Sequence, residues 1–323
     1  MMLTTKAPWA DLDLPSLVDQ ARELTDQFFP REILFAAPSQ KYYDTGGYRN
    51  ERRAFRTISV TGQACALRCE HCGTKVLDGM MPARAPGALA EIGAALVDEG
   101  ARGVLISGGC LDDGSVPLDR FLEDIGRLKE KGLKVLVHTG LVRREIARGL
   151  KAAGVDQILL DIIGDDRTIR EVYHLDRTTE AYRESLRILR EEGLSAIPHV
   201  VVGLHFGEIL GEWEALRMIR DEGASQLVIV ALQPLPGTGM AGVRSVSGDE
   251  VGKVLAAARI MMPGMPISLG CARPAGPEKR SMERWALRVG VQSIAYPLPE
   301  TVAYAEQLGI RISYHEQCCS VLN

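Results

Sequence analysis

The sequence lacks the features that would place it among membrane or nucleic-acid-binding proteins. Aromatic residues make up only 5% of its 323 residues, and no apolar run approaches the roughly 20 residues that a membrane helix needs. The formal net charge is −4, so the composition does not predict a strongly basic surface for nucleic acid. We therefore expect neither a membrane nor a nucleic acid as a partner.

Cysteine is scarce and unevenly placed. The chain has seven cysteines, an odd number that argues against a secreted disulfide framework. Residues 1–64 contain none, and residues 1–10 contain no apolar core of signal-peptide length. We therefore expect a reducing compartment, the cytoplasm, which also suits oxygen-sensitive groups.

Three of these cysteines lie close together in the chain. Cys65, Cys69 and Cys72 have the spacing C-x3-C-x2-C, after a strand-like segment at 55–60 and a Thr-Gly turn. Three thiolates on one loop can hold three corners of a four-iron cluster and leave the fourth iron open, whereas clusters that only carry electrons normally have four cysteines. The alternatives are a zinc knuckle or three unrelated buried cysteines. Structural zinc favours four ligands in paired C-x2-C units, and the sequence has no second C-x2-C.

This run resembles the cysteine signature of the radical S-adenosylmethionine (SAM) superfamily. The resemblance implies a [4Fe-4S] cluster whose open iron is chelated by the amino and carboxylate groups of SAM. It also implies that an electron from the cluster cleaves SAM, giving a 5'-deoxyadenosyl radical that abstracts hydrogen from an unactivated carbon. His71 occupies the position before the last cysteine, which is usually aromatic in the family.

The middle of the chain alternates apolar strand-like runs with amphipathic helices. A buried parallel strand has such a continuously apolar sequence, and Leu118, Phe121, Leu122, Ile125 and Leu128 follow the helical period. Ser247 and Glu250 predict a capping box. The candidate strands are 55–61, 103–108, 134–139, 157–163, 196–204, 226–232, 266–271 and 291–297.

Eight strands alternating with helices predict a parallel α/β barrel. We favour the closed (β/α)8 form, because the last two units, with helices at 279–289 and 299–308, look regular. The alternative is a partial (β/α)6 barrel with a C-terminal extension. We expect an N-terminal helix (11–28) and cap segment within residues 1–54, the barrel at 55–309, and a cysteine-containing tail at 310–323 that folds over the barrel mouth.

The active site of such a barrel lies at the carboxyl ends of its strands. Ser107, Gly108 and Gly109 resemble the family segment that holds the methionyl amino group of SAM, and glycine allows close backbone approach. The position of Asp161 resembles that of a residue that often hydrogen-bonds the SAM ribose. The runs that begin at Gly203 and at Gln233-Pro234 resemble segments that flank SAM and its adenine. His138 and His199 are either packing residues or a ligand and base.

The remaining cysteines are Cys110, Cys271, Cys318 and Cys319. Four thiolates would complete a second, auxiliary [4Fe-4S] cluster. Two follow predicted strands at the barrel mouth, and the adjacent pair follows a run, 311–317, that is long enough to fold back. The alternative is that all four are small buried hydrophobic residues. Neighbouring side chains in an extended chain point to opposite faces, so the pair needs a turn, or only one of the two ligates.

The segment from Cys271-Ala-Arg273 to Tyr296 resembles the carboxyl-terminal region of biotin synthase-like enzymes. That resemblance implies sulfur insertion at an unactivated C–H bond, with an auxiliary cluster sacrificed as the sulfur source. Within this group the chain is most similar to the two-protein type of lipoyl synthase. The implied partners are an octanoylated lipoyl carrier domain, a second related radical SAM chain, and a reductant such as ferredoxin or flavodoxin.

Two other hypotheses stay open at this point. One is a radical SAM enzyme of methylation, rearrangement or cofactor maturation, with a structural or redox second cluster. The other is a non-enzymatic iron–sulfur scaffold or electron carrier, which would leave a reactive iron exposed for no purpose.

Overall fold

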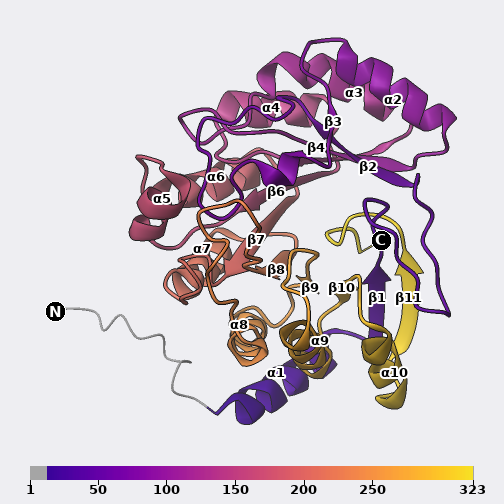
Figure 1. The fold of residues 1–323 in the computed structure, drawn as a ribbon, viewed down its shortest axis with the longest axis vertical. Helices are drawn as coiled ribbons and strands as arrows, with labels where there is room; N and C mark the ends of the chain where they lie inside the picture. Colours follow the sequence, from indigo (N-terminus) through magenta and orange to yellow (C-terminus); the bar gives the residue numbers. More distant parts are fainter. Residues whose placement is uncertain (1–12, 323) are drawn as a thin grey trace.

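The computed structural model describes residues 13–322, and a parallel sheet of eleven strands ringed by helices forms its centre (Figure 1). The order across the sheet is β11-β1-β10-β9-β8-β7-β6-β5-β4-β2-β3. The strands are β1 (Glu32–Ala36), β2 (Phe55–Ser59), β3 (Met81–Pro82), β4 (Gly103–Ser107), β5 (Lys134–His138), β6 (Gln157–Asp161), β7 (Ala196–Val202), β8 (Leu227–Ala231), β9 (Ile267–Leu269), β10 (Ser293–Ala295) and β11 (Arg311–His315).

All eight predicted strands are present, as β2 and β4 to β10, and they lie side by side in chain order. Their continuous apolar sequences have the expected cause, because both faces are covered. In β8, for example, all five residues are buried. The parallel α/β barrel is thus confirmed.

The helices cover the outside of this sheet (Figure 1). The α-helices are α1 (Leu14–Phe28), α2 (Ala88–Asp98), α3 (Leu122–Glu130), α4 (Arg144–Ala152), α5 (Asp166–Tyr173), α6 (Thr179–Glu191), α7 (Glu212–Glu222), α8 (Gly248–Met261), α9 (Pro277–Val289) and α10 (Pro299–Gln307). Two short 3-10 helices, η1 (Lys75–Leu77) and η2 (Asp119–Phe121), lie in the connections between strands and helices. The predicted capping box opens α8, where Ser247 Oγ accepts from the Glu250 N–H at 3.2 Å and the Glu250 carboxylate accepts from the Ser247 N–H at 2.7 Å.

The barrel has the partial form that we gave as the alternative, and the favoured closed form is not found. In the described residues, β10 pairs with β1 and β1 pairs with β11, so the ladder has free ends at β11 and β3. The reason is that β1, which we expected to be part of the cap segment, occupies the edge of β10 that closure would require. That alternative counted six strands, whereas the eight predicted strands, β2 and β4 to β10, are all neighbours in the sheet.

Side chains cover the gap between the two ends of the sheet. The Tyr48 ring, from the segment between β1 and β2, stacks on Tyr314 of β11 with centroids 4.1 Å apart. The Glu316 carboxylate accepts hydrogen bonds from Tyr48 Oη at 2.5 Å and from Arg102 Nη2 at 2.8 Å. This gap, which we call the seam, is therefore covered by aromatic stacking, by the Tyr48–Glu316 hydrogen bond and by ion pairs of Arg102, where a closed barrel would have a backbone ladder.

Residues 316–322 turn into the barrel after β11 (Figure 1). Cys319 and Val321 pack with side chains that line the barrel interior, among them Leu159, Ile197 and Val228. The division into segments 1–54, 55–309 and 310–323 stays a prediction, and residues 1–12 and 323 lie outside the described part of the chain.

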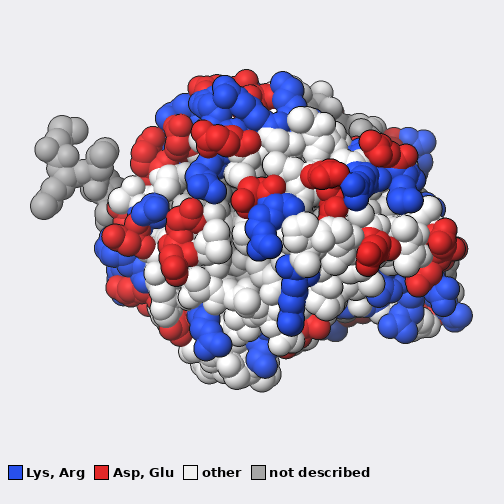
Figure 2. Space-filling view, turned by 90° about the horizontal axis from the view of Figure 1, so that it is seen from above, with Lys and Arg blue, Asp and Glu red and all other residues white. Residues whose placement is uncertain are grey.

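Lys and Arg alternate with Asp and Glu over the face that Figure 2 presents. This mixture agrees with the small net charge of −4. Within residues 13–322, no helix combines the length and apolar character that crossing a membrane requires.

Candidate functional site

The predicted site residues gather at the carboxyl edge of the sheet. The three-cysteine loop follows β2, Ser107 ends β4, Asp161 ends β6, and Gly203 follows β7. Gln233 and Pro234 follow β8 and are half-buried. Because neighbouring parallel strands end at one edge, these segments from distant parts of the chain share one mouth of the barrel.

Cys65, Cys69 and Cys72, the first cysteine group, lie on a compact loop. The backbone N–H groups of Cys72 and Gly73 donate to the Cys69 carbonyl at 3.1 and 2.8 Å. Arg68 takes a left-handed conformation, with φ 47°, which turns the chain between the first two cysteines. The loop geometry therefore brings three thiols to one place with few residues.

The thiols of Cys69 and Cys72 are hydrogen-bonded to each other. This bond lowers the pKa of Cys72 to about 7, although burial opposes the shift, and the Thr74 N–H assists it. The same bond, together with burial, raises the pKa of Cys69. One member of the pair is thus prepared as a thiolate, the form that binds metal.

Gly109 allows β4 to pack against this loop. A β-carbon at Gly109 would lie 2.0 Å from the Ala64 carbonyl oxygen and 2.5 Å from the Cys65 β-carbon. The Gly109 N–H donates to Thr61 Oγ1 at 2.7 Å. The cysteine loop therefore requires glycine at this position, and the role of Gly109 in binding SAM stays a prediction.

Asp161 is surrounded by aromatic and imidazole groups. His138 Nε2 lies 3.7 Å from its carboxylate, and Tyr173 Oη donates to it at 3.5 Å. Burial alone would raise the pKa of Asp161, but the hydrogen bond and charge of His138, with His199 and His71, lower it to about 2. The carboxylate therefore stays ionised and can accept hydrogen bonds from a ligand's hydroxyl groups.

His71 and His199 complete this polar lining. Burial lowers the pKa of His199 to about 4, with a further contribution from His138. The His71 ring lies 5.2 Å from that of Tyr173, and its buried Nδ1 has no partner among the described residues. A buried polar nitrogen without a partner is costly, so a bound ligand would satisfy it.

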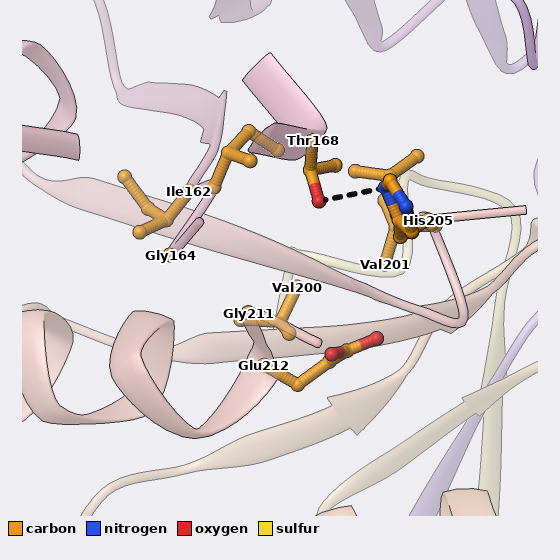
Figure 3. A pocket seen from close by; sticks show the side chains of 10 residues that line it. Ile162, Gly164, Thr168, Val200, Val201, His205, Gly211 and Glu212 are labelled. Atoms are coloured by element: carbon orange, nitrogen blue, oxygen red, sulfur yellow. Dashed lines mark hydrogen bonds between the residues drawn. The ribbon is translucent and has the colours of Figure 1, made fainter. Parts of the chain in front are cut away.

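Glu212, which sequence reasoning missed, holds the loop that follows β7. Its carboxylate accepts from the Gly203 N–H at 2.6 Å and from the Leu210 N–H at 2.9 Å. Burial raises the pKa of Glu212 to about 7 against these bonds. The side chain borders a small cavity of about 20 Å³ beside His205 and Thr168, whose side chains are joined at 3.2 Å (Figure 3).

Cys271, Cys318 and Cys319, the second cysteine group, form a separate thiol network. The Cys319 thiol is hydrogen-bonded to both Cys271 and Cys318, and these bonds raise its pKa. The bond from Cys319 lowers the pKa of Cys318. It also lowers the pKa of Cys271 to about 6, with help from Lys41 and Arg273.

Cys110 does not join the second group. Its carbonyl accepts from the Ala66 N–H at 2.8 Å, inside the first cysteine loop. Burial raises the pKa of Cys110 to about 12, and the other contributions come from Cys65, Cys72 and the acidic side chains at this mouth. The structure thus brings together three of the four cysteines that we assigned to the auxiliary cluster, and the ligand assignment itself stays a prediction.

Arg273, beside the second group, is held inside the protein. Its guanidinium donates to the Glu283 carboxylate at 2.8 Å and to the Ala295 carbonyl at 2.6 Å. Both side chains of this ion pair are almost fully buried, at 1% and 0% exposure. Arg273 therefore fixes the turn after β9 that carries Cys271.

These residues fit iron–sulfur groups better than a single ion. Within residues 13–322, no three His, Cys, Asp or Glu side chains are arranged to hold one metal ion. A four-iron cluster makes a different demand, because each cysteine binds its own iron at a separate corner. The three loop thiols, the orphaned His71 nitrogen and the ionised Asp161 together suit such a cluster with a polar organic ligand beside it.

Comparison with known proteins points to the same part of the chain. The sequence profile described as "Radical SAM superfamily" matches residues 59–221, half of the chain. Biotin synthase from Thermus thermophilus is 27% identical over 293 residues, covering 83% of this chain and 86% of that protein. Biotin synthase from Rickettsia felis is 31% identical over 197 residues, covering 55% and 60%.

Solved structures share the fold at low sequence identity. Methylornithine synthase (PylB) has a TM-score of 0.63 and 16% identity, covering 94% of this chain and 92% of that one. The FeFe-hydrogenase maturase HydG from Carboxydothermus hydrogenoformans has a TM-score of 0.64 and 16% identity, covering 94% and 74%.

Proposed function

Because the chain belongs to the radical SAM superfamily, we propose that it is a radical SAM enzyme that inserts sulfur into an unactivated C–H bond. The single observation that carries the sulfur step is the second cysteine group, three hydrogen-bonded thiols separate from the radical SAM loop. Similarity to biotin synthases over 83% of the chain supports the same reaction class.

The first cysteine group and its neighbours would hold the SAM cluster and SAM. When bound, these groups supply a radical that can remove hydrogen from an unactivated carbon. Asp161, ionised at neutral pH, would accept from the ribose hydroxyls. Gly109 keeps the loop close to β4, and Glu212 orders the Gly203 loop. The chain's own contribution is therefore to bind and orient SAM.

The second cysteine group would hold an auxiliary cluster as the sulfur source. Its thiols donate to and accept from one another, so two of the three pKa values are lowered and those thiols are prepared for metal binding. Cys271 is exposed whereas Cys319 is buried. This gradient would leave one side of the cluster open toward the substrate.

For the substrate we propose an octanoyl chain on a lipoyl carrier domain, with a second related chain and a ferredoxin- or flavodoxin-type reductant as partners in the cytoplasm. The support is the sequence resemblance, in which paired chains each add one sulfur. Biotin formation from its sulfur-free precursor is a second candidate, favoured by the biotin synthase relatives.

The test uses anaerobically reconstituted protein with SAM, a reductant and either an octanoylated carrier domain or the biotin precursor. We expect 5'-deoxyadenosine together with a sulfur-bearing acyl carrier, detected by mass spectrometry. Cys271→Ala is the matched control, which we expect to cleave SAM without forming the sulfur product. Product from the biotin precursor alone would select the second candidate. SAM cleavage without sulfur transfer to either substrate would contradict sulfur insertion.

A further inference from the structure

The seven residues from His315 to Val321 form a loop that is closed by one imidazole. His315 Nδ1 accepts from the Gln317 backbone N–H at 2.9 Å. Its Nε2 lies 2.9 Å from the Val321 carbonyl oxygen. The Val321 N–H also donates to the Cys318 carbonyl at 2.9 Å, which forms a tight turn around the adjacent cysteines.

These two contacts fix the tautomer of His315. A backbone N–H can only donate and a carbonyl can only accept, so Nδ1 carries the lone pair and Nε2 carries the hydrogen. Burial lowers the pKa of His315, in keeping with a neutral ring. Both ring nitrogens are thus used within this loop.

A second anchor ties the loop to the opposite wall of the barrel. Ser320 Oγ donates to Gln157 Oε1 at 3.0 Å, and Gln157 Nε2 donates to the Ser320 carbonyl at 3.1 Å. Gln157 is the first residue of β6. Ser320 and Val321 are fully buried, so the loop has no solvent-exposed face at this point and its conformation is set by the barrel.

The turn answers the difficulty that two adjacent cysteines present. In an extended chain Cys318 and Cys319 would point to opposite faces, yet Cys319 is hydrogen-bonded to both Cys318 and Cys271. The closed loop folds the chain enough for the three thiols to meet.

We infer that His315, supported by Gln157, is the positioning residue that holds the 315–321 loop as a preformed binding site for the auxiliary cluster. This inference rests on the proposed function, since it requires that the second cysteine group binds a cluster. It adds that the ligand geometry depends on hydrogen bonds made by residues that do not themselves bind iron.

The test substitutes His315 and measures iron, sulfide and the electron paramagnetic resonance (EPR) and Mössbauer spectra after anaerobic reconstitution. His315→Phe keeps an aromatic ring but makes neither hydrogen bond. We expect its iron content to fall from about eight to about four per chain, with the SAM-responsive cluster signal retained. His315→Asn and His315→Gln, which can each replace one of the two bonds, should give intermediate iron contents.

Two further variants keep the test decisive. Gln157→Leu removes the second anchor from another element, and we expect it to lower iron content in the same way even if His315→Phe folds poorly. Glu316→Gln changes the same tail on the side that faces Tyr48 and Arg102, and should keep about eight irons.

The outcomes separate the two proposals. Wild-type protein with about four irons would overturn the auxiliary cluster and this inference with it. Wild-type protein with about eight irons, combined with folded His315→Phe and Gln157→Leu variants that also keep about eight and unchanged spectra, would overturn only the positioning role.

Discussion

The two cysteine groups are built in opposite ways. Cys65, Cys69 and Cys72 come from one short loop after β2. In the second group, Cys271 follows β9 and the Cys318–Cys319 pair follows β11, so that α9, β10 and α10 lie between them in the chain. The first group depends on local turns and one close glycine contact. The second depends on a tail that enters the barrel and on side-chain anchors from other elements. A group of cysteines that are close in the sequence can be recognised from their spacing, whereas a group that folding brings together can be recognised only once the structure is known.

The largest expected effects come from removing one thiol of each group. Cys69→Ala should abolish SAM cleavage, because the SAM cluster loses a ligand. Cys271→Ala should keep cleavage and abolish the sulfur product. Quantifying 5'-deoxyadenosine and product in parallel checks this prediction. If both variants lost SAM cleavage equally, the two groups would not be functionally separate.

A smaller effect is expected from Gly109→Ala, which tests the local character of the first group. The new methyl group would overlap the Ala64 carbonyl and the Cys65 side chain, and forcing an extra carbon into a packed site costs roughly 1–3 kcal/mol. We expect SAM affinity to fall about 100-fold at the upper end of that cost, while the second group keeps its iron. Gly126→Ala is the control, since a β-carbon at Gly126 has only a contact at 4.0 Å. Unchanged SAM binding in Gly109→Ala would contradict the role of this contact.

Asp161→Asn should weaken SAM binding about tenfold, the effect of losing one charge-assisted hydrogen bond. It also has a pH signature. The pKa of Asp161 is about 2 in the folded protein against a reference value of 3.8, so ionised Asp161 stabilises the fold above the reference value and this contribution is lost as the pH falls toward 2. The shift corresponds to about 2 kcal/mol.

Urea unfolding of the cluster-free protein at pH 7 and pH 3.5 measures the first part of this loss, about 0.6 kcal/mol, because most of it falls between pH 3.5 and pH 2. The wild type should lose more stability than Asp161→Asn on going to the lower pH. Equal losses would show that the field of His138, His199 and His71 does not act on this carboxylate.

The smallest effect is expected at the seam beside the second group. Arg102→Ala removes an ion pair with Glu316 in which Arg102 is 58% exposed, and pairs of this kind contribute about 0–1 kcal/mol. Both cysteine groups should keep their iron. Loss of iron from the second group alone would mean that the seam, and not only His315 and Gln157, holds the tail in place.

Sequence reasoning found the parts of the molecule that are encoded locally. The eight barrel strands were readable because each is a continuous apolar run, and the first cysteine group because its ligands are adjacent in sequence. It missed β1 and the open edge, since Glu32–Ala36 lies between prolines, and nothing local states that β10 pairs with it and not with β2. The neighbours of Cys110 were not predictable for a related reason, because strand order predicts the edge that Cys110 shares but not that it lies beside the first cysteine group. Glu212 and His315 gave no signal, as their roles depend on backbone groups brought together by folding.

The central claim is that the protein carries two separate iron–sulfur sites, one on the local loop and one built by the tail. Mössbauer spectroscopy with iron analysis of wild-type protein and of Cys319→Ala, each with and without SAM, tests it most directly. The account predicts about eight irons in the wild type and about four in Cys319→Ala, with the SAM-induced spectral change preserved in both. About four irons in the wild type, or loss of the SAM response in Cys319→Ala, would contradict it.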